Sequence, residues 1–276
     1  MNTASEMKSL QGKKGFLCDM DGVIFHDGQL LVGARSFVNW LNENGKRYLF
    51  LTNASRHTPS DLKNKMARLG LDVDESKFYT SALATAQFLH NQLPGCTAYV
   101  IGDSGLLVAL HEMGIRSNDV NPDYVVVGET RDYDYDKVSK AIGFVRKGAR
   151  LIGAQPDMTS PSQDGLIPAC RALIAPIELA AERKAYYVGK PNALMMRTGL
   201  SLLGTHSSET AIIGDRMDTD IIAGIETGLD TVLVLSGVTS KEQIGAFPYR
   251  PKYVLNGIGE VASSLGRASA RSLLPV

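Results

Sequence analysis

The sequence is poor in the features that mark secreted and membrane proteins. Its three cysteines, Cys18, Cys96 and Cys170, are spread over 276 residues. An odd and widely spaced set gives neither a disulfide framework nor a metal-ligand spacing, so we expect buried or free thiols in a reducing compartment. No apolar run reaches the length of a membrane span, and the polar residues 1–14 argue against a signal peptide. We therefore expect a cytoplasmic protein.

Excess charge of either sign is also lacking. Lys plus Arg and Asp plus Glu both number 29, so the formal net charge is zero. Proteins that bind nucleic acid polymers or membrane surfaces usually carry a basic excess, so we expect neither partner. A small anionic molecule needs only a local site and stays compatible with this balance. The chain has no Gly-x-Gly-x-x-Gly after its first predicted strand, which disfavours a dinucleotide-binding enzyme.

Short apolar runs alternate with helical patterns along most of the chain, which predicts an α/β fold with a parallel sheet. We expect strands at residues 15–18, 48–51, 98–101, 124–127, 211–213, 231–235 and, at a sheet edge, 253–255. We expect helices at residues 59–69, 137–146, 174–181, 192–203 and 218–229. The last of these should bury Ile221, Ile222, Ile225 and Leu229, and the tail from Arg267 should be frayed.

The length and the order of these patterns predict two domains. A chain of 276 residues exceeds one average domain. The middle of the chain has an α/β character of its own, which indicates an inserted domain. We predict a discontinuous core domain of residues 1–84 and 184–276, with residues 85–183 inserted.

Two carboxylates follow the first predicted strand, in Asp19-Met20-Asp21-Gly22-Val23. Open parallel sheets bind ligands beyond the carboxyl ends of their strands. Acids two residues apart in an extended segment can point to the same side, so one can attack while the other handles a proton. Gly22 permits the tight turn that leaves the strand. A solvated acidic turn would produce the same pattern without function.

Two further segments offer groups that suit a phosphate. Thr52 and Asn53 follow the second predicted strand, where a hydroxyl and the following backbone N–H groups can face an anion. Lys190 precedes Pro191, which can start a helix, and a lysine there can hold a phosphate as a point charge. Taken alone, a strand-ending turn and a solvated lysine explain both segments.

A second acidic group follows the predicted strand at residues 211–213. Asp215 is placed like a metal ligand and Asp220 like a support for it. Magnesium prefers oxygen ligands and is commonly held by one or two carboxylates. A capped helix start would explain Asp218 and Asp220 without a function.

These motifs occur in the order of an Asp-x-Asp pair, a Ser or Thr, a Lys and an acidic cluster, and so the sequence resembles the haloacid dehalogenase (HAD) superfamily. Four further segments resemble its NagD-type subfamily, class IIA. These are Phe78-Tyr79-Thr80-Ser81, Val127-Gly128-Glu129-Thr130, Tyr187-Val188-Gly189-Lys190-Pro191 and Leu235-Ser236-Gly237-Val238. The resemblance extends from about Lys14 to Ser264.

The resemblance implies a Rossmann-like core with a large inserted α/β cap domain of the C2 type. It implies Asp19 as the nucleophile and Asp21 as the acid/base. Mg²⁺ would be held by the Asp19 and Asp215 carboxylates and the Asp21 backbone carbonyl, with Asp220 in support. The phosphate would be held by Thr52, Asn53 and Lys190.

The expected activity is therefore a Mg²⁺-dependent phosphatase acting on small phosphorylated metabolites, with nucleoside monophosphates as the expected substrates. The subfamily often has Asn-Pro-Asp where this chain has Gln155-Pro156-Asp157, in a loop that can face the leaving group. That departure leaves a sugar phosphate, phosphoglycolate or pyridoxal phosphate open as the substrate. A phosphoryl transferase and a non-catalytic relative also stay open. A homo-oligomer formed through the cap would fit the resemblance.

Overall fold

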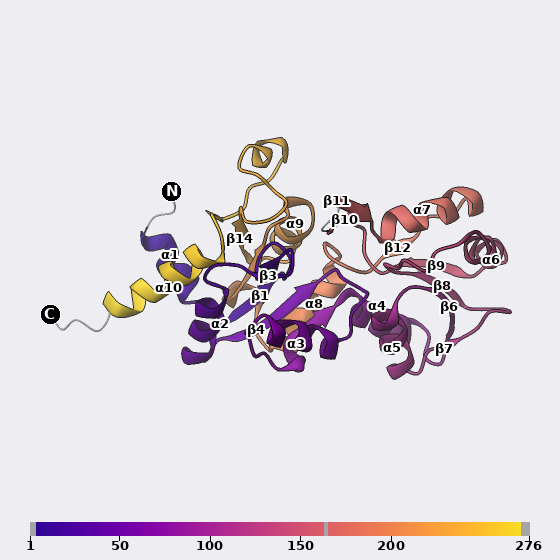
Figure 1. The fold of residues 1–276 in the computed structure, drawn as a ribbon, viewed down its shortest axis with the longest axis horizontal. Coiled ribbons are helices and arrows are strands. Elements are labelled where there is room, and N and C mark those ends of the chain that lie inside the picture. The colour runs from indigo at the N-terminus through magenta and orange to yellow at the C-terminus, as the bar shows by residue number, and fades with distance from the viewer. Residues whose placement is uncertain (1–3, 163–164, 272–276) are drawn as a thin grey trace. The chain divides into compact units, whose positions relative to one another are not determined.

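The structure is a computed structural model that describes residues 4–162 and 165–271 (Figure 1). It contains two compact units. Unit 1 comprises residues 1–51, 66–73 and 196–276, and unit 2 comprises residues 52–65 and 74–195. The predicted domain bounds, 1–84 with 184–276 and 85–183, differ from these units and stay a prediction. No helix in the described part of the chain is both long and apolar enough to span a membrane.

Unit 1 is built on a parallel sheet with the strand order β15-β14-β13-β1-β4. The strands are β1 (Gly15–Cys18), β4 (Arg47–Thr52), β13 (Thr210–Gly214), β14 (Asp230–Val234) and β15 (Tyr253–Leu255). Their apolar side chains are almost all buried, as expected for a sheet covered on both faces. In register, Cys18 lies between Phe50 of β4 and Ile213 of β13. The carboxyl ends of these three strands therefore lie at the same edge of the sheet, within two residues of one another in register.

Helices and short strands complete unit 1. Helices α1 (Ala4–Gln11) and α2 (Ala34–Glu43) both contact α10 (Ile258–Arg271). A short hairpin of β2 (Phe25–His26) and β3 (Gln29–Leu30) follows the first strand. The remaining elements are η2 (Ser207–Glu209), η3 (Met217–Ile221), α9 (Ile222–Glu226) and η4 (Gln243–Ala246). Helices α3 (Pro59–Arg68) and α8 (Ala193–Leu203) each include residues of both units.

Unit 2 has its own parallel sheet, with the order β12-β9-β8-β6-β7. The strands are β6 (Thr97–Ile101), β7 (Arg116–Ser117), β8 (Tyr124–Val127), β9 (Arg150–Gly153) and β12 (Tyr186–Tyr187). The helices are α4 (Ser81–Gln92), α5 (Ser104–Glu112), α6 (Tyr135–Arg146) and α7 (Cys170–Ala181). The hairpin of β10 (Thr159–Ser162) and β11 (Gly165–Pro168), the turn η1 (Glu75–Lys77) and β5 (Phe78–Thr80) complete the unit.

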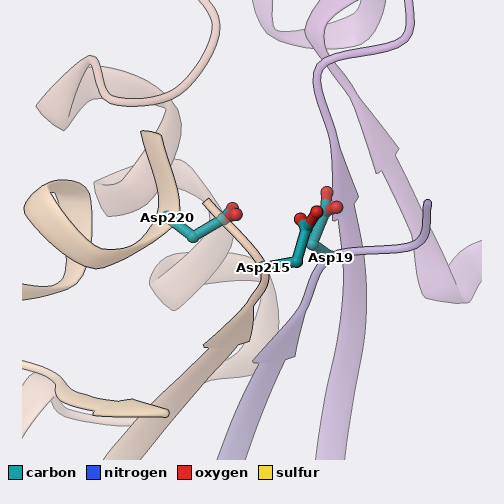
Figure 2. Close-up of side chains that lie close together, drawn as sticks. All are labelled: Asp19, Asp215 and Asp220. Carbon is teal, nitrogen blue, oxygen red and sulfur yellow. The ribbon is translucent and has the colours of Figure 1, made fainter. Parts of the chain in front are cut away.

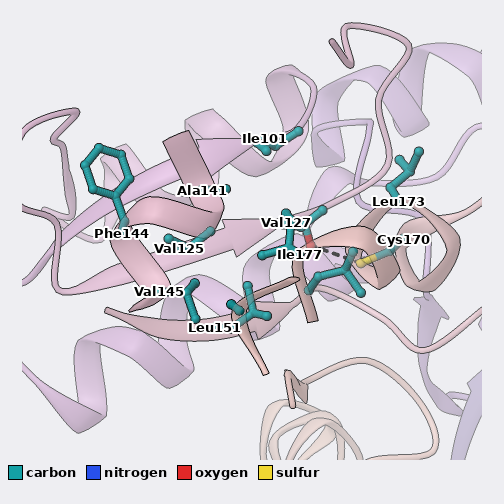
Figure 3. Packing of buried hydrophobic residues seen from close by; sticks show 12 residues of the cluster. Ile101, Val125, Val127, Ala141, Phe144, Val145, Leu151, Cys170, Leu173 and Ile177 are labelled. Atoms are coloured by element: carbon teal, nitrogen blue, oxygen red, sulfur yellow. Dashed lines mark hydrogen bonds between the residues drawn. The ribbon is translucent and has the colours of Figure 1, made fainter. Parts of the chain in front are cut away.

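One hydrophobic cluster of unit 2 combines buried residues of its sheet with residues of the helices α6 and α7 (Figure 3). Val125 and Val127 of β8 pack there against Phe144 and Ile177. The Cys170 thiol donates a hydrogen bond to the Val127 carbonyl over 3.0 Å, and complete burial raises the pKa of this thiol to about 12. All three cysteines are buried and free, as predicted.

The predicted strands are confirmed to within a residue or two at each end, and so is the parallel α/β fold class. One prediction about a helix is wrong, namely that Ile225 is buried on a regular helical face. The segment after Asp215 begins with the π-helical turn η3, in which the Ile221 N–H donates to the Arg216 carbonyl five residues back. The turn shifts the helical phase and leaves Ile225 40% exposed. Helix α10 extends to Arg271, and residues 272–276 lie outside the described part, so the predicted fraying of the tail stays a prediction.

Candidate active site

Three carboxylates meet in unit 1 beyond the carboxyl ends of β1 and β13 (Figure 2). Because Cys18 pairs with Ile213, the residues that follow leave the sheet side by side, and the Asp19 N–H donates to the Ile213 carbonyl over 2.8 Å. Asp19 and Asp215 come from these two ends. Asp220 points towards them from η3. One oxygen from each of the three lies within 4.8 Å of the other two, so together they could hold a metal ion.

Asp215 is fixed in place by the loop after β14. Its carboxylate accepts a hydrogen bond from the Val238 N–H over 2.7 Å, and its carbonyl accepts one from the Thr239 N–H. Two glycines make room for it. A Cβ at Gly237 would lie 2.0 Å from Asp215 Oδ2, and a Cβ at Gly22 would lie 2.6 Å from the same atom. Any side chain at either position would displace the carboxylate.

Asp220 is held by the same turn that brings it into the group. It is fully buried, and its Oδ2 accepts a hydrogen bond from the Arg216 N–H over 3.2 Å. By contrast, Asp218 is 56% exposed and forms an ion pair with the Arg216 guanidinium. Asp218 therefore fits the interpretation of a helix start that has no role in metal binding or catalysis, whereas Asp220 lies within the group of carboxylates.

The Asp21 carboxylate is not part of this group and is 52% exposed. Its Oδ1 lies 3.5 Å from His26 Nδ1. His26, for which the sequence predicted no role, comes near Asp21 because the chain turns back directly after the motif. The Gly22 N–H donates to the Phe25 carbonyl, and Asp21 forms a bridge with Phe25. An exposed carboxylate can exchange protons with solvent, as an acid/base residue must.

Thr52, Asn53 and Lys190 lie together in unit 2 and are all buried. Asn53 Oδ1 accepts a hydrogen bond from the Lys190 N–H over 2.7 Å, and Asn53 Nδ2 donates to the Lys190 carbonyl over 3.0 Å. Asn53 Nδ2 also donates to Asp157 Oδ2 over 3.1 Å. A Cβ at Gly189 would lie 2.7 Å from Asn53 Oδ1, so only glycine allows this approach.

The structure therefore brings the predicted residues together as two sets. Asp19, Asp215 and Asp220, with Asp21 nearby in sequence, belong to unit 1. Thr52, Asn53 and Lys190 belong to unit 2. Thr52 Oγ1 accepts a hydrogen bond from the Ala54 N–H, which closes the turn at the end of β4.

Glu129 is a buried acid of unit 2 to which sequence analysis assigned no role. Its two carboxylate oxygens accept hydrogen bonds from the Ser55 N–H over 3.2 Å and the Ser160 hydroxyl over 2.7 Å. Its N–H donates to the Ser55 hydroxyl over 2.9 Å. Burial raises the pKa of this carboxyl above its usual value. One feature of the sequence could have indicated a role for Glu129: it is a charged residue that closely follows the apolar strand β8.

The loop that departs from the subfamily pattern is also partly buried. Gln155 is 1% exposed, and its side-chain oxygen accepts a hydrogen bond from the Asp157 N–H. The same loop thus places Asp157 against Asn53. The expected contacts of residues 155–165 with a leaving group stay a prediction, and residues 163 and 164 lie outside the described part.

Comparison with known families gives two matches along the chain. Residues 16–116 match the model of a haloacid dehalogenase-like hydrolase, and residues 187–261 match a second, HAD-hydrolase-like model. The first match includes the Asp19 motif and Thr52. The second includes Lys190 and the Asp215 cluster.

Individual relatives match nearly the whole chain. A dihydroxyacetone phosphatase of Corynebacterium glutamicum is 45% identical over 247 residues, which is 90% of each chain. The ribonucleotide monophosphatase NagD of Escherichia coli is 45% identical over 90% of this chain and 98% of its own, and its solved structure superposes with a TM-score of 0.85. An acid sugar phosphatase of Staphylococcus aureus is 35% identical over 91% of this chain and 98% of its own.

Proposed function

Because the chain belongs to the haloacid dehalogenase superfamily, as one of its NagD-type phosphatases, we propose that it hydrolyses phosphate monoesters of small metabolites with the help of Mg²⁺. The observation that carries this proposal is the meeting of Asp19, Asp215 and Asp220, whose oxygens lie within 4.8 Å of one another. A divalent cation held by oxygens of this group would offset its concentrated negative charge.

The group suits a magnesium ion in charge and in chemistry. Two unit negative charges 4.8 Å apart repel by roughly 3.5 kcal/mol at an effective dielectric of about 20. A divalent cation would remove this repulsion, and oxygen ligands are those that Mg²⁺ prefers. The carboxylates of Asp19 and Asp215 and the backbone carbonyl of Asp21 would hold it, with Asp220 in support. When bound, Mg²⁺ supplies positive charge for the phosphoryl oxygens.

The chain's own residues then carry out two steps. Asp19 attacks phosphorus and forms an aspartyl phosphate, while Asp21 gives its proton to the leaving alkoxide. Asp21, now ionised, takes a proton from water, which hydrolyses the aspartyl phosphate and releases orthophosphate. Asp19 is regenerated and Asp21 is again protonated. The exposure of the Asp21 side chain suits a group that must change its protonation state in each half of the cycle.

Thr52, Asn53 and Lys190 are proposed to bind the phosphate group of the substrate. Lys190 supplies a positive charge and Thr52 a hydroxyl. The side chain of Asn53 is engaged with Lys190 and Asp157, so we assign it the task of positioning the Lys190 backbone. Its contribution to the phosphate is then its backbone N–H.

Nucleoside monophosphates are our first candidate substrates, in line with the ribonucleotide monophosphatase NagD at 45% identity. Triose and sugar phosphates are the second candidates. The names of two relatives, a dihydroxyacetone phosphatase and an acid sugar phosphatase, favour them. We place the activity in the cytoplasm, on small molecules only, with no membrane or nucleic acid polymer as a partner.

The test is release of orthophosphate from a panel of nucleoside monophosphates, sugar phosphates and dihydroxyacetone phosphate, with and without EDTA. We expect release that EDTA abolishes. Asp19→Asn should lower kcat at least about a thousandfold, whereas Asp218→Asn, which alters an exposed ion pair, should change it less than about twofold. Absence of release from every compound, with folded protein and Mg²⁺ present, would overturn the proposal in favour of a transferase or a non-catalytic relative.

A further inference from the structure

Unit 2 contains a cavity of about 550 Å³ at the amino ends of its parallel strands. It lies among α4, α6, β8, β9 and β12, which are labelled in Figure 1. Tyr124, Arg150 and Tyr186, the first residues of β8, β9 and β12, all line it. No role has so far been assigned to any of its lining residues.

The cavity is distinct from the residues proposed to bind the substrate phosphate. In unit 2, Glu129, Gln155 and Lys190 follow the opposite, carboxyl ends of β8, β9 and β12. A strand rises about 3.3 Å per residue, so the two ends of the four-residue strand β8 lie roughly 10 Å apart. A ligand in the cavity would therefore not touch those residues.

The lining of this cavity is strongly basic. It includes Arg146, Arg150, Arg183 and Lys184, and it includes no acidic residue. Among the side chains that the structure describes, no carboxylate forms an ion pair with any of these four. In a chain of zero net charge, four unpaired cations around one concave surface make a local field that attracts an anion with several charges.

The cavity also presents aromatic surface beside the cations. The rings of Phe88 and Tyr186 are stacked, with centroids 5.0 Å apart and planes 25° apart, and Tyr186 remains 45% exposed. The Arg150 guanidinium lies over the Tyr124 ring, 5.5 Å from its centroid. A planar aromatic group of a ligand can stack on such a ring, while its anionic part reaches the basic side chains.

We propose that this cavity is a second binding site, for a nucleotide that carries two or more phosphate groups. The base stacks on Tyr186, and the phosphates bind Arg146, Arg150, Arg183 and Lys184. The charge of such a ligand balances most of the four cations, and its aromatic base uses the ring that would otherwise stay exposed. The site does not depend on the proposed phosphatase chemistry, because it shares no residue with it.

Isothermal titration calorimetry of the full chain with ATP tests the site directly. EDTA and excess orthophosphate are present, to prevent turnover and to occupy the proposed phosphate-binding residues. We expect ATP to bind, and the double variant Arg183→Ser with Lys184→Ser to bind it at least about tenfold more weakly. Lys147→Ser is the matched control, because Lys147 is exposed, neighbours Arg146 in sequence and does not line the cavity. It should change the Kd less than about twofold.

Two further probes separate the aromatic from the anionic part. Tripolyphosphate, which has no base, should bind more weakly than ATP and should be unaffected by Tyr186→Ser, which should weaken ATP. Adenosine alone should not bind measurably. Absence of ATP binding, or ATP binding that the Arg183 and Lys184 substitutions leave unchanged, would overturn the site. Equal binding of tripolyphosphate and ATP would overturn its assignment to a nucleotide.

Discussion

The side-chain amide of Asn53 pairs with both polar backbone atoms of Lys190, although 137 residues separate the two in sequence. The Asn53 amide makes the same pair of hydrogen bonds that a neighbouring β-strand would make. Its oxygen accepts from the Lys190 N–H, and its nitrogen donates to the Lys190 carbonyl. All the groups involved are buried, and a buried backbone group without a partner is costly. The pair therefore fixes the main chain from which the Lys190 side chain starts.

Asn53→Ala should remove both hydrogen bonds and leave the Lys190 N–H and carbonyl without these partners. We expect the free energy of unfolding in urea to fall by about 3 kcal/mol. We expect kcat to fall about a hundredfold under conditions in which the variant is folded, since a displaced lysine no longer meets the phosphate. Asn91→Ala, which removes an exposed amide that accepts a hydrogen bond from Gln87, is the control. A variant with lowered stability and unchanged kcat would contradict the positioning role of Asn53.

Gly237→Ala should displace the Asp215 carboxylate, because the new Cβ would lie 2.0 Å from Asp215 Oδ2. We expect the Mg²⁺ concentration for half-maximal activity to rise at least about tenfold, as is typical when the support of a metal ligand is disturbed. Gly245→Ala is the matched control, since a Cβ there would meet no atom within 4 Å. An unchanged Mg²⁺ dependence in Gly237→Ala would argue against Asp215 as a metal ligand.

The sequence predicted those parts of the fold that depend on local patterns. Buried strands such as 15–18 and 211–213 are continuous apolar runs, and their parallel pairing follows from the helices between them. Once those strands are placed, the position of Asp19 and Asp215 just after them predicts that the two carboxylates meet. The sequence indicated Asp220 as a support for Asp215, but the placement of the strands alone does not bring its carboxylate close to the other two. Its close approach depends on the π-helical turn at Met217–Ile221, for which the sequence carries no clear signal.

Contacts between distant segments were the other features beyond prediction. The hydrogen bonds of Glu129 with Ser55 and Ser160 join segments that no periodicity relates. The resemblance to the HAD superfamily implied Asn53 as a phosphate-binding residue, and only the structure reveals its hydrogen bonds with Lys190 and Asp157. A polar residue in a turn has the same local pattern whether its partner is a ligand or the chain itself.

Removal of metal should lower the thermal stability of the protein. Mg²⁺ that binds only the folded state at about one hundred times its Kd contributes about 2.7 kcal/mol. We therefore expect Tm to rise when Mg²⁺ replaces EDTA in differential scanning calorimetry, and Asp215→Asn to lose most of this rise. Asp218→Asn should retain it, because the exposed Asp218 lies outside the group of three carboxylates. An equal rise in both variants would place the ion elsewhere.

Glu129→Gln should change how stability depends on pH. Burial raises the pKa of the Glu129 carboxyl in the folded state above 4.5, its ordinary value. The folded state therefore holds a proton that the unfolded state has lost in the window between those two pKa values. Wild-type stability should fall as pH rises through this window, by at most about 1.4 kcal/mol per pH unit from this group.

The glutamine variant has no such proton to lose, so its unfolding free energy relative to wild type should rise with pH above 4.5 and then level off. Urea unfolding of both proteins at pH values from 4 to 8 measures this difference. Glu112→Gln, at an exposed position, is the control. A difference independent of pH would mean that the pKa of Glu129 is the same in the folded and unfolded states, because the hydrogen bonds from Ser55 and Ser160 fully offset the effect of burial.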